Sequence, residues 1–344
     1  MPNAFSRRLL VWYDRHGRHD LPWQHPRSAY RVWIAEVMLQ QTQVATVVAY
    51  FLRFVETFAS LRALAAAPLD DVLALWSGLG YYSRARNLHR AAQICVERHR
   101  GALPRDFAAL AALPGIGRST AGAILAQAHG LRCTILDGNV KRVLARHHGV
   151  RGWPGATATQ KKLWALAESH TPQARVADYT QAIMDLGATV CTRSRPRCAD
   201  CPLKQTCAAN REGIVAQLPQ RKPKRALPTR KTVMLVLRDR AGRILLERRP
   251  PSGVWAQLWS LPEADDAHAA RRHLGKPLKL RALPPFVHTF SHYRLDVAPM
   301  TAIVAASRGI ADAPGRRWLL PRDAAALGLP APVRKLIEAC SEEC

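Results

Sequence analysis

A single carboxylate, Glu36, stands in the stretch WIAEVMLQQTQV (residues 33–44), where three glutamines and a threonine follow it. The apolar residues of this stretch recur at the three- and four-residue spacing of a helix. Glu36, Gln40 and Gln43 then share one helix face. That face is either a solvated polar stripe or the wall of a substrate site, and the spacing alone slightly favours the stripe.

A second carboxylate, Asp137, follows a glycine-rich turn. In LPGIGRSTAGAI (residues 113–124), Gly115 and Gly117 come just before a helical pattern, and Asp137 stands twenty residues after Gly117. Glycines let the backbone turn tightly, so that its N–H groups can face a phosphate at the helix start. Asp137 is placed to cap the next helix, and capping by itself is enough to explain it.

Four of the eight cysteines lie within seventeen residues and could hold a metal: Cys191, Cys198, Cys201 and Cys207. Four thiols suffice for a tetrahedral zinc ion or for an iron–sulfur cluster. A zinc site of this kind usually shows two Cys-x2-Cys pairs, whereas this loop has one. The spacing therefore leaves the metal open.

The loop between the first two of these cysteines, TRSRPR, contains Arg193, Arg195 and a third arginine. A metal site that pins such a loop would make a rigid clamp for phosphate. The alternative interpretation is a solvated surface loop. That interpretation is less favoured because the whole chain is basic.

The composition favours nucleic acid as a partner. The chain has 344 residues, 48% of them hydrophobic, and carries 51 Lys and Arg against 25 Asp and Glu, for a net charge of +26. Such an excess attracts polyanions, although a generally basic surface is the plainer explanation. The length fits two domains. Neither a run of eighteen apolar residues nor a signal peptide is evident, so we expect a cytoplasmic protein (nucleoid-associated if bacterial) with no membrane partner.

The elements that must position these residues differ between the two parts of the chain. Up to about residue 210 the apolar spacing predicts an all-α domain, and turn motifs such as SGLG and LDGN separate the helices. The predicted helices are Ala29–Phe54, Leu69–Trp76, Ala85–Val96, Ser119–Ala128, Val140–Arg146 and Lys161–Glu168.

After this domain the pattern changes. The stretch QLPQRKPKRALPTRK has three prolines and six basic residues, which is typical of an extended linker. Beyond it, TVMLVLRD and GRILLERR read as a hairpin, and HYRLDVAPMTAIVAA as a further strand. Helical patterns return at Asp266–His273 and Pro332–Ala339. We therefore predict a second, smaller α+β domain.

The Leu-Pro-Gly-Ile-Gly hairpin, Asp137 and the four-cysteine loop resemble, in order and spacing, the helix-hairpin-helix DNA glycosylases related to endonuclease III. The segments EVMLQQTQV and GLGYYSRARNL and the second domain narrow the resemblance to the adenine DNA glycosylases of the MutY family. The resemblance extends over nearly the whole chain.

This resemblance implies a multidomain protein. Residues 1–215 would form the all-α helix-hairpin-helix glycosylase domain, with a [4Fe-4S] cluster loop at 191–207. Residues 216–231 would form the basic, proline-rich linker, and residues 232–344 a Nudix-like domain that recognises 8-oxoguanine. The implied substrate is double-stranded DNA with adenine opposite 8-oxoguanine or G, bound by a monomer with one cluster per chain.

The resemblance also implies roles for particular residues. Glu36 and Asp137 match the family's catalytic carboxylates, Asn139 would orient the aspartate or a water, and the four cysteines would hold the cluster. Trp23 would wall the adenine pocket, although an ordinary buried tryptophan is an equal alternative. The residues expected to contact DNA are Gln40, Gln41, Thr42, Leu79, Tyr81, Gly115, Gly117, Arg193, Arg195, Phe290, Ser291 and His292.

The chemistry needs two carboxyl groups in opposite protonation states. Protonation of adenine at N7 makes it a leaving group, and a desolvated Glu36 can still hold that proton near neutral pH. The sugar becomes oxocarbenium-like, and an ionised Asp137 at a helix start can stabilise it or attack it. The base must also leave the stack, and Gln41 and Tyr81 could fill the disturbed duplex.

Two departures from related enzymes narrow the activity. Relatives that also cut the backbone use a lysine nucleophile at the position of Ser119, so we expect a monofunctional glycosylase. Lys141, one turn from Asp137, could still trap the product adventitiously. In the second domain, ADDAHAARRHLG has no glutamate after Glu263, so we expect no Mg²⁺-dependent nucleotide hydrolysis.

Two rival functions remain open. One is a glycosylase/lyase for oxidised pyrimidines, against which Ser119 argues. The other is an iron–sulfur DNA-binding or damage-sensing protein without catalysis, against which the presence of both Glu36 and Asp137 argues.

Overall fold

The computed structural model describes residues 3–222, 226–272, 279–290, 292–304, 315–324 and 326–342. The chain forms two compact units, and both are discontinuous in sequence. Unit 1 comprises Met1–Ala66 and Asn87–Lys224, and unit 2 comprises Ala67–Arg86 and Arg225–Cys344. The sequence did not predict that Ala67–Arg86 would group with the C-terminal part.

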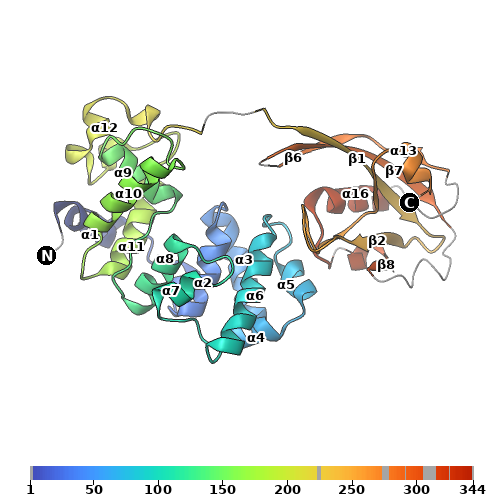
Figure 1. Ribbon diagram of the computed structural model, residues 1–344, viewed down its shortest axis with the longest axis horizontal. Coiled ribbons are helices and arrows are strands. Elements are labelled where there is room, and N and C mark those ends of the chain that lie inside the picture. Colours follow the sequence, from blue (N-terminus) through green and yellow to red (C-terminus); the bar gives the residue numbers. More distant parts are fainter. Residues whose placement is uncertain are drawn as a thin grey trace. The chain divides into compact units, whose positions relative to one another are not determined.

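Unit 1 is helical, as the sequence predicted (Figure 1). Its helices and short helical turns are α1 (Ala4–His16), η1 (Pro22–Gln24), α2 (Ala29–Leu39), α3 (Val44–Thr57), α4 (Leu61–Ala66), α6 (Ser83–Arg98, which begins in unit 2), α7 (Phe107–Ala111), α8 (Arg118–His129), α9 (Gly138–His147), α10 (Thr157–His170), α11 (Val176–Asp185), η2 (Leu186–Val190), η3 (Cys198–Asp200), η4 (Lys204–Thr206), α12 (Ala208–Arg211) and η5 (Val215–Gln217).

The helix predicted over Ala29–Phe54 is two helices. It breaks between Leu39 and Val44, where Gln41 has a left-handed backbone with φ of +62°. A side chain of the L series resists this conformation, so the helical hydrogen-bond pattern ends there. The helical spacing of apolar residues continues across the break, so the break could not be predicted from that spacing. The break leaves Gln41 exposed at the end of the helix that carries Glu36.

The core beside α9 explains how its first turn is held. Apolar side chains from α1, α9, α10 and α11 form one buried cluster, with Leu9, Leu144, Leu163 and Ile183 each at most 1% exposed. Burial of apolar area on this scale is the main force that stabilises a helical domain. The start of α9 therefore projects from a packed core.

Unit 2 is built on a mixed sheet (Figure 1). Its strands are β1 (Thr229–Arg238), β2 (Ile244–Arg248), β3 (Trp259–Ser260), β4 (Glu263–Ala264), β5 (Arg281–Ala282), β6 (Phe286–Thr289), β7 (Arg294–Ile303) and β8 (Arg316–Leu319), and its helices are α5 (Leu69–Leu75), α13 (Ala267–Arg272), α15 (Pro321–Ala324) and α16 (Ala331–Glu342). The predicted hairpin is confirmed, because β1 and β2 pair antiparallel with Arg238 opposite Ile244. β1 also pairs in parallel with β7 along its whole length.

The alternation of side chains along β1 places a core on each face of the sheet. Val233, Leu235 and Leu237 join a cluster with Ala270 of α13. Met234 and Val236 join the opposite cluster, to which Val333 and Ile337 of α16 belong. Successive residues of a strand point to opposite faces, so a strand covered on both sides is apolar throughout.

A search for helices of the length and hydropathy needed to cross a bilayer finds none among the described residues.

Candidate active site

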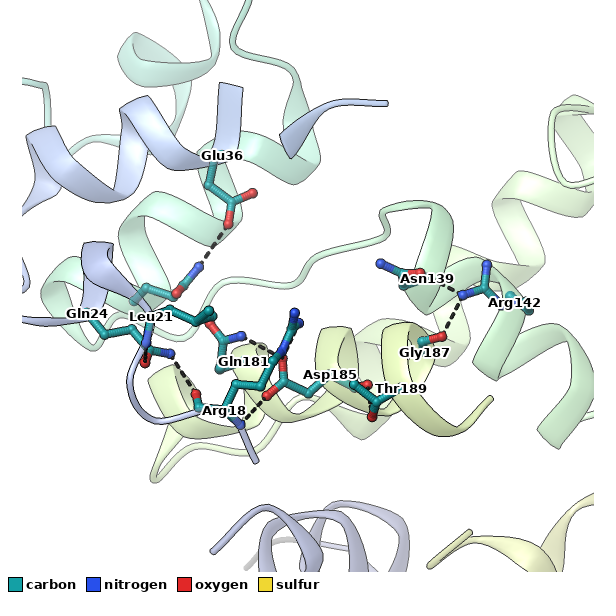
Figure 2. Close-up of polar contacts among 11 residues, drawn as sticks. Arg18, Leu21, Gln24, Glu36, Asn139, Arg142, Gln181, Asp185, Gly187 and Thr189 are labelled. Atoms are coloured by element: carbon teal, nitrogen blue, oxygen red, sulfur yellow. Dashed lines mark hydrogen bonds and ion pairs between the residues drawn. The ribbon is translucent and has the colours of Figure 1, made fainter. Parts of the chain in front are cut away.

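Glu36 lies on α2 and is shielded from solvent on most sides. Its carboxylate Oε1 accepts a hydrogen bond of 3.0 Å from Nε2 of Gln127 on α8 (Figure 2). Burial and, to a smaller extent, the charge of Asp137 raise the pKa of Glu36 to about 7, while the Gln127 bond lowers it. Glu36 is thus an acid that retains its proton near neutral pH. It is not part of a solvated stripe.

Asp137 is the N-cap of α9, as predicted. Its Oδ1 accepts a hydrogen bond of 2.8 Å from the backbone N–H of Val140. Burial is the largest influence and leaves the pKa of Asp137 raised, although the backbone N–H groups of Val140 and Asn139 and the positive charges of Arg142 and Lys141 act to lower it. These groups hydrogen-bond to the charged form or attract it.

The two carboxyl groups come from distant parts of the sequence and act on one another. The negative charge of Asp137 is the second cause, after burial, of the raised pKa of Glu36. Two neighbouring carboxyls do not both ionise readily in a shielded site. Their environments differ, because Asp137 has helix N–H groups and cations while Glu36 has one amide. Burial thus raises the pKa of both carboxyls, and fewer groups oppose that increase at Glu36 than at Asp137.

Helix α8 holds the segment that leads into Asp137. The hydroxyl oxygen of Ser119 accepts a hydrogen bond of 2.9 Å from the backbone N–H of Leu136. Gly122 brings α8 so close that a Cβ there would stand 2.5 Å from the carbonyl oxygen of Thr134. Ser119 and Gly122 together place residues 134–137 against α8. The Ser119 side chain thus bonds to the backbone, and among the described residues no hydrogen bond joins it to a carboxylate.

Asn139 is bound to the segment before the cysteines. Its Oδ1 accepts a hydrogen bond of 2.6 Å from Arg142, whose guanidinium also donates to the carbonyl oxygen of Gly187 at 2.7 Å (Figure 2). The same guanidinium donates to the carbonyl oxygen of Cys191 at 2.7 Å. The Asn139 side chain is thus engaged with Arg142, and its backbone N–H faces Asp137. The amide therefore fixes the first turn of α9.

The four cysteines line one small pocket of about 30 Å³, and Arg146, Val190 and Val215 contribute to its walls. Arg146 donates to the Cys191 sulfur at 3.4 Å and to the Thr192 carbonyl oxygen at 2.7 Å. Burial and, to a smaller extent, the other three thiols raise the pKa of the Cys201 thiol to about 11, while a backbone hydrogen bond from Leu203 lowers it. A thiolate-binding metal would therefore displace protons here.

Four thiols are chemically suited to hold a metal group as thiolates. The cysteines are unpaired, they surround a shared space, and they influence one another electrostatically. No group of three or more His, Cys, Asp or Glu side chains in the described ranges is drawn tightly enough to hold a metal ion. Arg193 and Arg195 of the loop are exposed, as a phosphate clamp would require.

The glycine turn and the end of α2 present backbone and amide groups. Gly115 has a φ of +78°, and a Cβ there would meet the Asn87 side chain at 2.9 Å. Gly117 is the N-cap of α8 and has open space around its Cα. Gln40 approaches Thr120 at 3.4 Å, while Thr42 is partly buried.

The predicted DNA contacts in unit 2 differ in exposure. Tyr81 is 49% exposed and has a φ of +48°, whereas the Leu79 side chain is only 6% exposed. Phe290 is partly buried and stacks on Tyr293 at 4.6 Å, and His292 is exposed. Ser291 lies outside the described residues. The structure presents Tyr81 and His292, and not the Leu79 side chain, to solvent.

Trp23 is a buried residue of unit 1. It is 3% exposed and packs edge-on against Phe51, with ring centroids 5.4 Å apart. The structure places this side chain in the core of unit 1, and its role as a wall of the adenine pocket stays a prediction.

Sequence reasoning missed several polar residues of this region. Asp185, fully buried, accepts hydrogen bonds from Arg18 and from Gln181 at 2.7 Å (Figure 2). Gln127 and Arg142 were also missed. A signal existed for Gln127, since it is the polar member of the apolar run AGAILAQ on α8.

The fold and these carboxylates define a base excision DNA repair protein. The pattern of the HhH-GPD superfamily of such proteins matches residues 34–169, and that of the NUDIX domain matches residues 233–339. A thermostable thymine-DNA glycosylase has a similar structure, with 27% identity and a TM-score of 0.55, over 60% of this chain and 95% of that one. An endonuclease III–DNA complex, 23% identical with a TM-score of 0.52 over 61% of this chain and 95% of that one, shares the fold.

The adenine DNA glycosylase of Buchnera aphidicola from Acyrthosiphon pisum is 37% identical over 97% of both chains. The human adenine DNA glycosylase is 36% identical over 92% of this chain and 70% of its own length. This chain belongs to the adenine DNA glycosylase family. Its reaction is hydrolysis of an N-glycosidic bond in base excision repair, and DNA is its partner.

The raised pKa of Glu36 gives a prediction for stability. Its ordinary value is 4.5 and its value in the folded protein is about 7, so the buried group costs little while protonated below pH 4.5. The cost grows as the pH rises from 4.5 to about 7 and levels off above that range. The variant Glu36→Gln cannot ionise, and we expect it to be more stable than the original chain at pH 8 by about 1–2 kcal/mol.

Urea unfolding at pH 5 and pH 8 measures this difference. At pH 5 the two proteins should be almost equally stable. Glu97→Gln changes an exposed glutamate of α6 and is the matched control, for which the difference should stay near zero. A Glu36→Gln variant that is less stable than the original at pH 8 would contradict the assignment.

Proposed function

We propose that this enzyme removes adenine from mispairs with 8-oxoguanine or G, and that it leaves an intact abasic strand. Glu36 is the general acid, and Asp137 is the group that stabilises or attacks the oxocarbenium-like sugar. The observation that carries this proposal is the pair of carboxyls in contrasting surroundings, of which the one with a pKa of about 7 is Glu36.

The first step is proton transfer from Glu36 to N7 of the extruded adenine. A carboxyl with a pKa near 7 is protonated in a large fraction of molecules at neutral pH and is still acidic enough to donate. Base extrusion costs a few kcal/mol, and a mispaired base costs least. Loss of the neutral adenine then leaves positive charge on the sugar.

Asp137 meets that positive charge. The N–H of Val140 and the cations Arg142 and Lys141 favour its ionised form. A preorganised negative charge beside C1′ stabilises an oxocarbenium-like transition state. Ser119, which holds the Leu136 backbone, keeps the preceding residue in place and provides no amine for a lyase step.

The mispair is read by exposed groups on both units. In unit 1 these are Gln41 at the break after α2 and the turn of Gly115 and Gly117. In unit 2 they are Tyr81, whose ring can stack on a base, and the loop with His292. The functional division of the chain is then 1–215 for catalysis, 216–231 as linker and 232–344 for the lesion.

The four cysteines hold a [4Fe-4S] cluster in this proposal. The cluster would supply no chemistry to base removal, and it would pin the basic loop with Arg193 and Arg195. Support comes from the pocket that all four thiols line and from the hydrogen bond of Arg146 to Cys191. The enzyme acts as a monomer.

The variant Glu36→Gln tests the acid. Because Gln cannot donate a proton to N7, we expect single-turnover excision of adenine opposite 8-oxoguanine to fall at least about 1,000-fold. Binding to the same duplex should persist, since extrusion and stacking are unaffected. The original enzyme should lose about tenfold in rate for each pH unit above its Glu36 pKa of about 7.

These rates are measured on duplexes with adenine opposite 8-oxoguanine, G and T. We expect the first two to react and the last to be a poor substrate. Glu97→Gln is again the control and should excise at the original rate. Survival of excision in Glu36→Gln, or a rate that does not fall between pH 7 and 9, would exclude Glu36 as the acid.

Strand scission tests the monofunctional mechanism. Because Ser119 cannot form a Schiff base, the product strand should stay intact until alkali cleaves it. Any complex trapped by borohydride should be scarce and should vanish in Lys141→Ala. Scission without alkali at the rate of base removal would show a lyase.

Elemental analysis of the purified protein tests the cluster. We expect about four iron atoms per chain and no stoichiometric zinc. Cys198→Ser should lose the iron, whereas Cys133→Ser, a partly buried cysteine outside the loop, should retain it. One zinc per chain in place of iron would contradict the cluster assignment.

A further inference from the structure

Gln127 is a buried amide in an apolar stretch. Helix α8 buries seven consecutive residues from Ala121 to Gln127, and the other six are Ala, Gly, Ile or Leu. Gln127 is only 4% exposed. An apolar side chain of similar size would fill this place without the cost of desolvating an amide. The position therefore needs a reason other than packing.

Among the described residues, the Gln127 side chain makes one hydrogen bond, and its partner is the catalytic acid, Glu36. Nε2 of Gln127 donates to Oε1 of Glu36 at 3.0 Å. Its own Oε1 is buried and has no hydrogen-bond partner among the described residues. A buried unpaired acceptor costs free energy, so the bond to Glu36 is maintained at a net expense.

An amide suits a partner that gains and loses a proton. An ionised carboxylate only accepts hydrogen bonds, whereas a protonated carboxyl can also donate one. By turning about its last bond, a glutamine can offer Nε2 to the first form and Oε1 to the second. The unpaired Oε1 is therefore the acceptor that Gln127 holds for the protonated acid.

We propose that Gln127 is a positioning residue for Glu36, which orients the protonated carboxyl and stabilises the carboxylate that remains after adenine takes the proton. Its effect grows with the charge that develops on Glu36, so it favours the transition state over the ground state. The catalytic part of this inference rests on the proposed function, but the hydrogen bond itself does not. The charged group that acts on Glu36 is Asp137, at the start of α9.

Replacement of Gln127 by Leu removes both polar atoms and keeps the volume. Since the Gln127 bond lowers the pKa of Glu36, Gln127→Leu should raise it above its original value of about 7. The alkaline limb of the rate profile should move to higher pH. At pH 6 the single-turnover rate should fall about tenfold, because the new carboxylate is no longer stabilised. The free energy of unfolding should be unchanged or higher, since a buried unpaired group is lost.

The Glu36 pKa is read directly from the full-length protein by ¹³C NMR of labelled glutamate carboxyls, with the signal assigned through Glu36→Gln. This titration tests the hydrogen bond even if the wild-type chain excises no adenine, which would count against the proposed function alone. Ile124→Val is the matched control. It removes a buried methyl group from α8, should lose some stability, and should change neither the pKa nor the rate.

A Gln127→Leu protein with an unchanged Glu36 pKa and an unchanged rate would overturn the proposal. A shifted pKa with an unchanged rate at pH 6 would overturn its catalytic part. Loss of stability without either effect would show a purely structural amide. If Gln127→Leu does not fold, Gln127→Met retains the length of the side chain without its donor and acceptor, and the same outcomes apply.

Discussion

The site depends on one constraint: water is excluded from a carboxyl group that lies beside a second carboxyl group. Glu36 belongs to α2 and its side chain bonds to α8. Burial and the charge of Asp137 both oppose its ionisation there. Asp137 is also shielded, but it stands at a helix start with N–H groups and cations around it. Burial thus raises the pKa of both carboxyl groups, but more hydrogen bonds and positive charges stabilise the charged form of Asp137 than that of Glu36.

Helix α9 connects the carboxylate to the cysteine loop. Asp137 caps its first turn, Arg142 in its middle bonds Asn139 and the carbonyl oxygens of Gly187 and Cys191, and Arg146 contacts Cys191 and Thr192. A short helix in a packed core moves little relative to the residues that contact it, so the positions of its two ends are coupled. Any group that orders the cysteine loop therefore also steadies the helix that presents Asp137.

Unit 2 contains the region that the NUDIX domain matches, residues 233–339. Its sheet is covered by α13 on one face and by α16 on the other. Glu263, the glutamate nearest the expected metal-binding helix, pairs with Arg249, so its carboxylate is engaged within the fold. The segment Ala67–Arg86 belongs to this unit as well, and it carries the exposed Tyr81.

Local sequence was sufficient for the helical N-terminal unit, the β1–β2 hairpin, the cap at Asp137 and the set of four cysteines, because periodicity, turn residues and short motifs encode them within a few positions. It could not show the break at Gln41, the grouping of Ala67–Arg86 with the C-terminal unit, or the burial of Leu79, and it left the burial of Trp23 as one of two equal alternatives. Above all, only the tertiary structure decided that Gln127, ninety-one residues from Glu36, would meet it, and that Glu36 would lie where burial raises its pKa. Desolvation and hydrogen bonding depend on what surrounds a side chain in space, and its neighbours in the chain do not determine that.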